Sequence, residues 1–192
     1  MFNKIKKFFV ALLNSIRMFF FKKNNTMRLF VDMDGTLAQW LNVDQSEIYK
    51  KGYFLNLPPH QKVVDAINRI KEDNFIEVYI LSCYLTDSRF AYNEKQKWVE
   101  KYLPGVQCIF VPCGFNKAEA VKNFTGKAVT ESDILLDDYS KNLHEWKTAG
   151  GTAVKLLNGI NHTKGTWKEA MVKISDIDIF QLYLHNKIIS IE

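Results

Sequence analysis

Short apolar runs rich in β-forming residues alternate with amphipathic stretches over most of the chain, and this alternation constrains the fold more than any other feature. The runs read RLFVDMD, IEVYILS, VQCIFVP, DILLDD and TAVKLL, in that order from Arg28. Helices are expected between them, near residues 60–73, 88–102, 116–124 and 141–148. Strands separated by helices of about ten or more residues indicate βαβ units. We therefore predict an α/β fold with a doubly wound, Rossmann-like parallel sheet of at least five strands.

Two acidic residues follow the first apolar run, at the edge of the sheet where ligands of such folds bind. Asp32 and Asp34 in LFVDMDGTL are two positions apart, so an extended backbone places both carboxylates on the same side. Two close carboxylates repel each other unless a cation lies between them, which indicates a Mg²⁺ site. The turn at Gly35 is expected to expose amides to phosphate oxygens. An EF-hand is disfavoured, because the glycine comes two positions too early and LFV is expected to be a strand.

Further polar residues lie where the later strands and helices are expected to begin or end. Ser82 ends the second run and is suited to a phosphate oxygen, although serine is also common at strand ends without such a role. Lys117 opens the helix after the third run, where an ammonium group and a helix N-terminus together favour an anion. An isolated lysine there is usually a surface residue. Asp137 and Asp138 end the fourth run, and adjacent acids at a buried strand end are costly without a cation.

The ordered set DMDGT, Ser82, Lys117 and Asp137-Asp138 resembles the four motifs of the haloacid dehalogenase-like (HAD) hydrolase superfamily, over about residues 28–157. The resemblance implies that Asp32 is a nucleophile that forms an aspartyl-phosphate. Asp34 is then the general acid and base, which favours a phosphatase over a dehalogenase, because a leaving alkoxide needs a proton. The implied Mg²⁺ ligands are Asp32, the backbone carbonyl of Asp34 and Asp138, with Asp137 in support. The implied phosphate-binding residues are Ser82, Lys117, Met33 and Gly35.

The segment KKGYFLNLPPHQKVVDAI is similar to the stretch that follows the cap in the pyrimidine 5′(3′)-deoxyribonucleotidases, which are cytosolic 5′-nucleotidases of type C. This narrower resemblance implies a substrate that is a nucleoside or deoxynucleoside monophosphate. Only about residues 39–56 are available for a cap, so we expect a minimal one. Other small phosphomonoesters and phosphorylated nucleic-acid ends therefore stay open as alternatives. Trp40, Tyr53 and Phe54 are candidates for stacking on a base, or else pack in the core or in a lid.

Residues 1–26 form a leader that holds six basic residues and no acidic one, whereas residues 27–192 hold 20 basic and 21 acidic residues and form the expected HAD-like domain. As a helix, residues 2–21 have one apolar and one basic side, which indicates peripheral contact with a membrane surface. A transmembrane span is disfavoured, because the apolar part, 8–21, is about 21 Å long as a helix and a hydrocarbon core is roughly 30 Å thick. A signal peptide without a small-x-small cleavage site and a dispensable extension ahead of Met27 stay open.

Other classes of function fit the sequence less well. Cys83 and Arg89 have the CxxxxxR spacing of cysteine phosphatases, but the intervening YLTDS lacks the glycine that a phosphate loop needs. Nucleic-acid binding is not expected, because the basic residues of the domain are scattered among acidic ones. A catalytically inactive, membrane-attached interaction module is a further alternative. The presence of every key motif residue argues against it.

Location and assembly are indicated only in outline. Three cysteines without a dense disulfide pattern indicate a reducing compartment, so we expect a cytoplasmic protein, with membrane association through the leader as an addition. The C-terminal segment ISDIDIFQLYLHNKIISIE is apolar enough to pack on the sheet or to form a homodimer interface.

Overall fold

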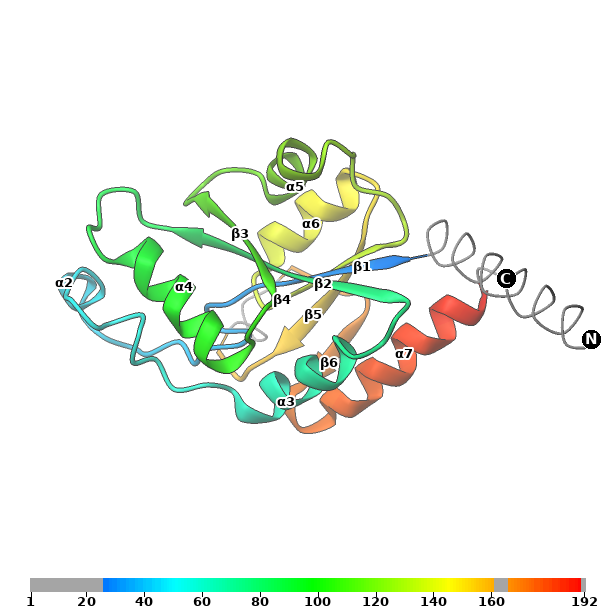
Figure 1. Cartoon of the computed structure of the whole chain (residues 1–192), viewed down its shortest axis with the longest axis horizontal. Helices are drawn as coiled ribbons and strands as arrows, with labels where there is room; N and C mark the ends of the chain where they lie inside the picture. Colours follow the sequence, from blue (N-terminus) through cyan, green and yellow to red (C-terminus); the bar gives the residue numbers. More distant parts are fainter. Residues whose placement is uncertain (1–25, 161–165, 191–192) are drawn as a thin grey trace, which may run out of the picture.

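A six-stranded, fully parallel sheet lies at the centre of the computed structural model, which describes residues 26–160 and 166–190 (Figure 1). The strands are β1 (Met27–Val31), β2 (Ile76–Tyr84), β3 (Gln107–Pro112), β4 (Asp133–Asp137), β5 (Thr152–Leu157) and β6 (Met171–Lys173). Their order is β3-β2-β1-β4-β5-β6, and every neighbouring pair is parallel. The predicted α/β sheet is confirmed, with β6 as an additional strand that the sequence did not indicate.

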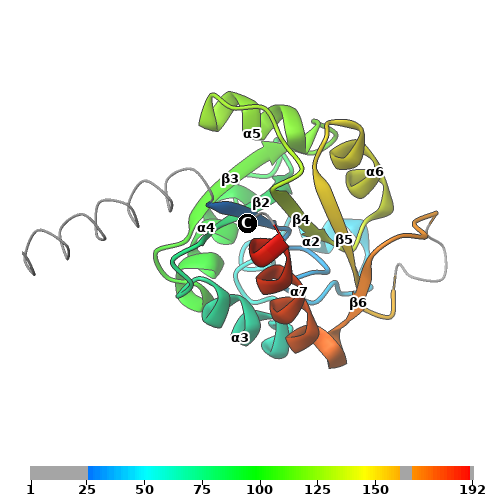
Figure 2. The ribbon, with the colours of Figure 1, turned by 90° about the vertical axis from the view of Figure 1, so that its right-hand side faces the viewer.

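Helices cover both faces of this sheet, as Figure 2 shows. On one face lie α5 (Lys117–Thr125) and α6 (Ser140–Thr148). On the other face lie α3 (Gln61–Ile70), α4 (Ala91–Tyr102) and α7 (Ile177–Ser190), which follows the short 3₁₀ helix η1 (Ile174–Asp176). The direction of the strand order reverses between β1 and β4, and open α/β sheets bind ligands at the carboxyl ends of the strands beside such a reversal.

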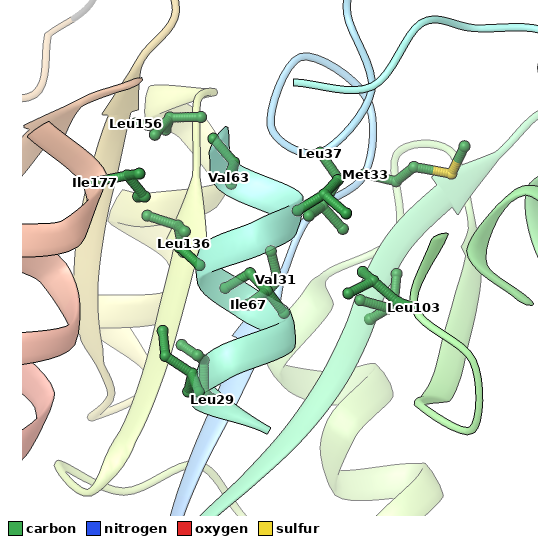
Figure 3. Close-up of a cluster of buried hydrophobic side chains, with 14 of the residues drawn as sticks. Leu29, Val31, Met33, Leu37, Val63, Ile67, Leu103, Leu136, Leu156 and Ile177 are labelled. Atoms are coloured by element: carbon green, nitrogen blue, oxygen red, sulfur yellow. The ribbon is translucent and has the colours of Figure 1, made fainter. Parts of the chain in front are cut away.

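The strand β1 shows how the sequence produces a sheet that is buried on both faces. Leu29 and Val31 belong to the apolar cluster beneath α3 and α7, whereas Phe30 belongs to the cluster beneath α5 and α6. A strand covered on both sides is apolar at nearly every position, which explains the continuous runs in the sequence. In Figure 3, Val63 and Ile67 of α3 lie over the side chains of the central strands and form the middle of the larger cluster.

The C-terminal segment packs on the sheet through α7. Ile177, Phe180 and Leu184 are at most 2 % exposed and belong to the cluster that contains α3. Ile179 and Leu182 lie on the opposite side of α7 and are 62 % and 63 % exposed. The first of the two predicted roles of this segment is therefore confirmed, and the predicted homodimer stays a prediction.

The insert between β1 and α3 is short, and backbone hydrogen bonds connect its two ends. It contains the one-turn helix α2 (Gln45–Ile48), which Figure 1 shows on the side of the sheet toward which β1 runs. Ala38 pairs with Pro59 in an antiparallel bridge, and the amide of His60 donates to the carbonyl of Leu37 at 2.7 Å. The middle of the insert is held by α4, because the Glu94 carboxylate accepts the amide of Gly52 at 2.6 Å.

The amino end of the sheet carries a buried ion pair, at the opposite end from the carboxyl ends of the strands. Arg28 of β1 donates two hydrogen bonds to the carboxylate of Asp133 at the start of β4, at 2.5 and 2.7 Å. Asp133 is 1 % exposed. This pair stabilises the register of two central strands, β1 and β4.

The predicted membrane contact through residues 2–21 falls outside the described residues and stays a prediction. Among the residues that the structure describes, no helix combines the length and the apolar character needed to cross a membrane.

Candidate active site

Three buried carboxylates meet at the carboxyl ends of the two central strands. Asp32 directly follows β1, Asp137 ends β4 and Asp138 comes next. One carboxylate oxygen from each lies within 4.8 Å of the others, and the three residues are 6 %, 0 % and 4 % exposed. They open onto a cavity of about 390 Å³. The sheet therefore brings together residues that are more than a hundred positions apart in the chain, as the strand-end argument predicted.

Lys117 lies between two of these carboxylates. Its ammonium nitrogen is 2.6 Å from Asp32 Oδ1 and 2.7 Å from Asp137 Oδ2, and the residue is 4 % exposed. Burial lowers the pKa of Lys117, but the two carboxylates outweigh burial and raise the pKa above its ordinary value. Lys117 is therefore a fixed, buried cation rather than the surface residue that an isolated lysine at this position would usually be.

The position of Lys117 is set by the start of α5. Asn116 is the N-cap, and its side-chain oxygen accepts the amides of Ala118 and Glu119 at 2.9 and 3.1 Å. Two of the free amides at this helix end are thus already satisfied. The ammonium group of Lys117 is what α5 contributes to the acidic cluster directly, together with the partial positive charge of the helix end.

The two acidic residues of the DMDGT motif both line the cavity but have different partners. β1 ends at Val31, and the chain then turns as the carbonyl of Met33 accepts the amides of Thr36, Leu37 and Ala38 at 3.2, 2.9 and 2.8 Å. Asp32 then meets Lys117 of α5, whereas Asp34 forms an ion pair with Lys95 of α4. These two helices cover opposite faces of the sheet.

Gly35 has a steric role in this turn. Its φ is 80°, a conformation that residues with a Cβ rarely adopt, and a Cβ added there would lie 2.4 Å from Asp138 Oδ2. Its amide donates to the carbonyl of Ala38 at 2.8 Å. The Gly35 amide is therefore already paired within the turn, and glycine lets the turn approach Asp138 closely; the predicted phosphate contact at Gly35 stays a prediction. The predicted phosphate contact at Met33 stays a prediction.

Lys95 is a residue of the site that the motif analysis missed. It is 1 % exposed, pairs with Asp34, donates to the carbonyl of Cys83 at 2.5 Å and lies 3.5 Å from Ser82 Oγ. Burial raises the pKa of Asp34, Lys95 opposes that effect, and the negative charge of Asp32 adds to it. The other carboxylate oxygen of Asp34, Oδ1, is buried without a hydrogen-bond partner among the described residues.

Two asparagines, also missed, orient the acidic pair at the end of β4. Asn142 donates to Asp137 Oδ2 at 2.8 Å, and the backbone amide of Tyr139 donates to Asp137 Oδ1 at the same distance. Asn158 donates to Asp138 Oδ2 at 2.7 Å and to the carbonyl of Gly35 at 2.9 Å. Asn158 thereby ties the turn after β1 to the end of β4.

The three aromatic residues proposed for stacking on a base lie in different surroundings. Trp40 is 42 % exposed and lines the cavity. Phe54 is 3 % exposed and lies in the core, with the ammonium nitrogen of Lys95 4.8 Å from its ring centroid. Tyr53 packs partly buried against the same core and does not line the cavity. Core packing thus accounts for Phe54 and Tyr53, while Tyr139, which is 53 % exposed, lines the cavity together with Trp40.

The geometry around Cys83 and Arg89 does not support the alternative hypothesis of a cysteine phosphatase. Cys83 lies within β2 rather than in a phosphate-binding loop, and Arg89 is exposed. The hydrogen bond between the Cys113 and Cys83 thiols, together with burial, raises the pKa of the Cys83 thiol, which disfavours the thiolate that such enzymes need.

The residues at the site fit a magnesium ion. The cluster of Asp32, Asp137 and Asp138 offers several carboxylate oxygens, which are the ligands that Mg²⁺ prefers. Burial raises the pKa of Asp137 although Lys117 opposes it, so this buried carboxylate stands where its charge is disfavoured. Lys117 pairs with Asp32 and Asp137, and a cation bound among the three carboxylates would favour their charged forms further. The close approach of Gly35 to Asp138 also keeps the backbone of the turn near the cluster.

Comparisons with known proteins identify the fold. No protein-family model and no curated protein matches the chain. D,D-heptose 1,7-bisphosphate phosphatase from B. bronchiseptica, solved with magnesium and phosphate, matches with a TM-score of 0.62 at 12 % identity, over 84 % of this chain and 99 % of that one. A HAD-superfamily hydrolase from Ehrlichia chaffeensis matches with a TM-score of 0.57 at 13 % identity, over 84 % and 99 % of the two chains. The magnesium-bound YfnB from Bacillus subtilis, described as a HAD hydrolase, has a TM-score of 0.58 at 8 % identity, over 83 % and 99 %. The chain therefore has the fold of HAD-superfamily hydrolases.

Proposed function

We propose that the chain is a magnesium-dependent phosphomonoester hydrolase that works through an aspartyl-phosphate on Asp32. The observation that carries this proposal is the buried bridge from Asp32 through Lys117 to Asp137, with Asp138 beside it, at the carboxyl end of the sheet. The HAD-like fold and the magnesium and phosphate in one neighbouring structure support it.

The side chains divide the reaction into two displacements. A carboxylate oxygen of Asp32 attacks phosphorus, the bond from phosphorus to the leaving oxygen breaks, and Asp34 gives that oxygen a proton. Asp34 then takes a proton from water, whose oxygen attacks the same phosphorus and releases Asp32. Lys117 lies 2.6 Å from Asp32 Oδ1 and offsets the negative charge that gathers on the phosphoryl oxygens.

Metal binding is assigned to residues that follow β1 and end β4. Asp32, Asp138 and the backbone carbonyl of Asp34 would hold a Mg²⁺ ion, with Asp137 in support, and the bound ion would supply positive charge against the phosphoryl oxygens. Ser82, which is fully buried with its Oγ 3.5 Å from the ammonium nitrogen of Lys95, is assigned to the phosphoryl oxygens.

Nucleoside and deoxynucleoside monophosphates are the proposed substrate class. The cavity of about 390 Å³ is within the usual range for small-molecule sites. Two exposed aromatic rings, Trp40 and Tyr139, lie at its lining and supply faces on which a base can stack. The similarity of the GYFLNLPP segment to the deoxyribonucleotidases supports the same class.

A phosphate-release assay on the full chain tests this proposal. The panel contains deoxyribonucleoside and ribonucleoside monophosphates, sugar phosphates and p-nitrophenyl phosphate, each with Mg²⁺ and with EDTA. We expect turnover that requires Mg²⁺ and a kcat/KM at least about tenfold higher for nucleoside monophosphates than for sugar phosphates.

The pattern of activity separates the alternatives. If kcat/KM is higher on sugar phosphates or on phosphorylated oligonucleotide ends than on nucleoside monophosphates, the substrate belongs to that class instead. Activity that survives EDTA would contradict the magnesium mechanism, and a folded protein inactive on the whole panel would favour a non-catalytic interaction module.

A further inference from the structure

Cys83 lines the cavity and Cys113 lies beside it, and the proposed mechanism uses neither of these cysteines. Cys83 is the penultimate residue of β2, and Cys113 directly follows β3. Their sulfur atoms are 2.9 Å apart. The amide of Cys113 donates to the carbonyl of Tyr84 at 3.0 Å, so the backbone pairing of the two strands continues to this point and holds the two residues together.

The two thiols differ in exposure in the way that a stepwise oxidation requires. Cys113 is exposed, whereas Cys83 is partly buried and lines the cavity with Asp32 and Asp34. As a thiolate, Cys113 accepts a hydrogen bond from Cys83, and this bond lowers the pKa of Cys113 to about 7 against an opposing effect of burial. An oxidant arriving from solvent thus meets the more acidic thiol first, with the second thiol in contact behind it.

We propose that Cys83 and Cys113 form an oxidative modification site, at which hydrogen peroxide converts the two thiols into a reversible disulfide. The Cys113 sulfur attacks peroxide, the O–O bond breaks, one water leaves, and a sulfenic acid forms. The Cys83 sulfur then attacks the Cys113 sulfur, the S–S bond forms, and the S–O bond breaks with loss of a second water. The two sulfurs lose two electrons, which reduce one peroxide to two waters.

The location links this modification to both lysines of the site. The carbonyl of Cys83 accepts the ammonium group of Lys95 at 2.5 Å, and Cys113 lies four positions before Lys117 in the chain. A disulfide between the two residues would therefore join the end of β2, whose Cys83 carbonyl holds Lys95, to the connection between β3 and α5, which leads to Lys117. Disulfides in reducing compartments are usually transient, and a reversible bond at this position is consistent with the compartment that the cysteine content indicates.

Thiol counting on the full chain tests the proposal without any measurement of turnover, so it stands or falls independently of the proposed phosphatase activity. The reduced protein is freed of reductant, treated with hydrogen peroxide, labelled with a maleimide and digested without reduction. Of the three cysteines, we expect Cys83 and Cys113 to lose their reactivity together, to appear as one cross-linked peptide, and to recover with dithiothreitol.

Cys108 supplies the matched control, because it is partly buried on β3 and burial raises its pKa to about 11. Cys108→Ser should form the same cross-link as the wild type, whereas Cys113→Ser and Cys83→Ser should form none. Oxidation of Cys113 to a sulfinic acid without a cross-link would overturn the proposal. Loss of Cys108 reactivity as fast as that of Cys113, or a disulfide through Cys108, would also overturn it.

Discussion

Replacing Asp32 with asparagine is expected to lower the rate of phosphate release by at least about 10³-fold, because it removes the group that attacks phosphorus. The amide has nearly the same volume as the carboxylate, and Lys117 keeps a second carboxylate partner, Asp137, at 2.7 Å. We therefore expect the variant to stay folded. The measurement compares kcat on the best substrate of the panel with the unfolding transition of the same preparation.

Asp133→Asn is the matched control for this substitution. Asp133 is an equally buried, charge-paired aspartate, but it lies at the opposite end of the sheet against Arg28. Its replacement should lower the free energy of unfolding by about 3 kcal/mol, as for other broken buried pairs, and should leave kcat unchanged. Near wild-type turnover in Asp32→Asn, or equal losses of turnover in both variants, would refute the assignment of Asp32 as nucleophile.

Replacing Lys117 with methionine is expected to lower the free energy of unfolding by about 3–5 kcal/mol when no divalent cation is present. The substitution fills a similar volume but leaves Asp32 and Asp137 buried without their shared cation. Phosphate release should fall as well, because Lys117 offsets phosphoryl charge. Urea unfolding measured with EDTA gives the loss of stability, and the same titration with Mg²⁺ tests the metal site.

The response to Mg²⁺ makes this second prediction specific. A ligand that binds only the folded state stabilises that state, and the gain grows with the ratio of the ligand concentration to its Kd. Mg²⁺ should therefore restore much of the stability of Lys117→Met, since it takes over the neutralisation of the acidic cluster. Lys95→Met is the control: it removes the partner of Asp34, whose carboxylate is not part of that cluster, so Mg²⁺ should restore less. Equal restoration, or none in either variant, would contradict a metal site at Asp32, Asp137 and Asp138.

The parts of the site that the sequence predicts are those that depend on strand ends. A parallel strand covered by helices on both sides is apolar until it leaves the sheet, so the first polar residue after each run marks the ligand-binding edge. Asp32, Ser82 and Asp137 are found in this way, and the structure brings them to one end of the sheet. Lys117 is found because it begins the helix that follows β3.

The parts that the sequence does not predict depend on how the turn after β1 folds. Alternation predicts that the Asp34 side chain points the same way as that of Asp32, and both line the cavity, but the carbonyl of Met33 accepts three amides and the turn gives Asp34 a different partner. The partner of Asp34 therefore comes from α4. Asn158 was missed for a similar reason, since it follows β5 without a motif and reaches Asp138 only through the tertiary fold.

Lys95 does have a signature in the sequence, although the motif comparison did not use it. The buried residues of α4 are Ala91, Glu94, Lys95, Trp98 and Val99, which follow the spacing of one helix face. Two charged residues on an otherwise apolar, core-facing stripe are costly unless each has a buried partner. Glu94 holds the insert through the amide of Gly52, and Lys95 holds Asp34. Charged residues at core positions of a helix therefore indicate a site even where no family motif includes them.

The most direct test of the proposed mechanism is to trap the phosphorylated residue. The full chain is mixed with Mg²⁺ and its best substrate, quenched with borohydride, which reduces an aspartyl-phosphate to homoserine, and mapped by peptide mass. An aspartyl-phosphate mechanism predicts homoserine at position 32, and none when EDTA replaces Mg²⁺. Turnover of the substrate without homoserine at position 32, or with the phosphoryl group on another side chain, would contradict it.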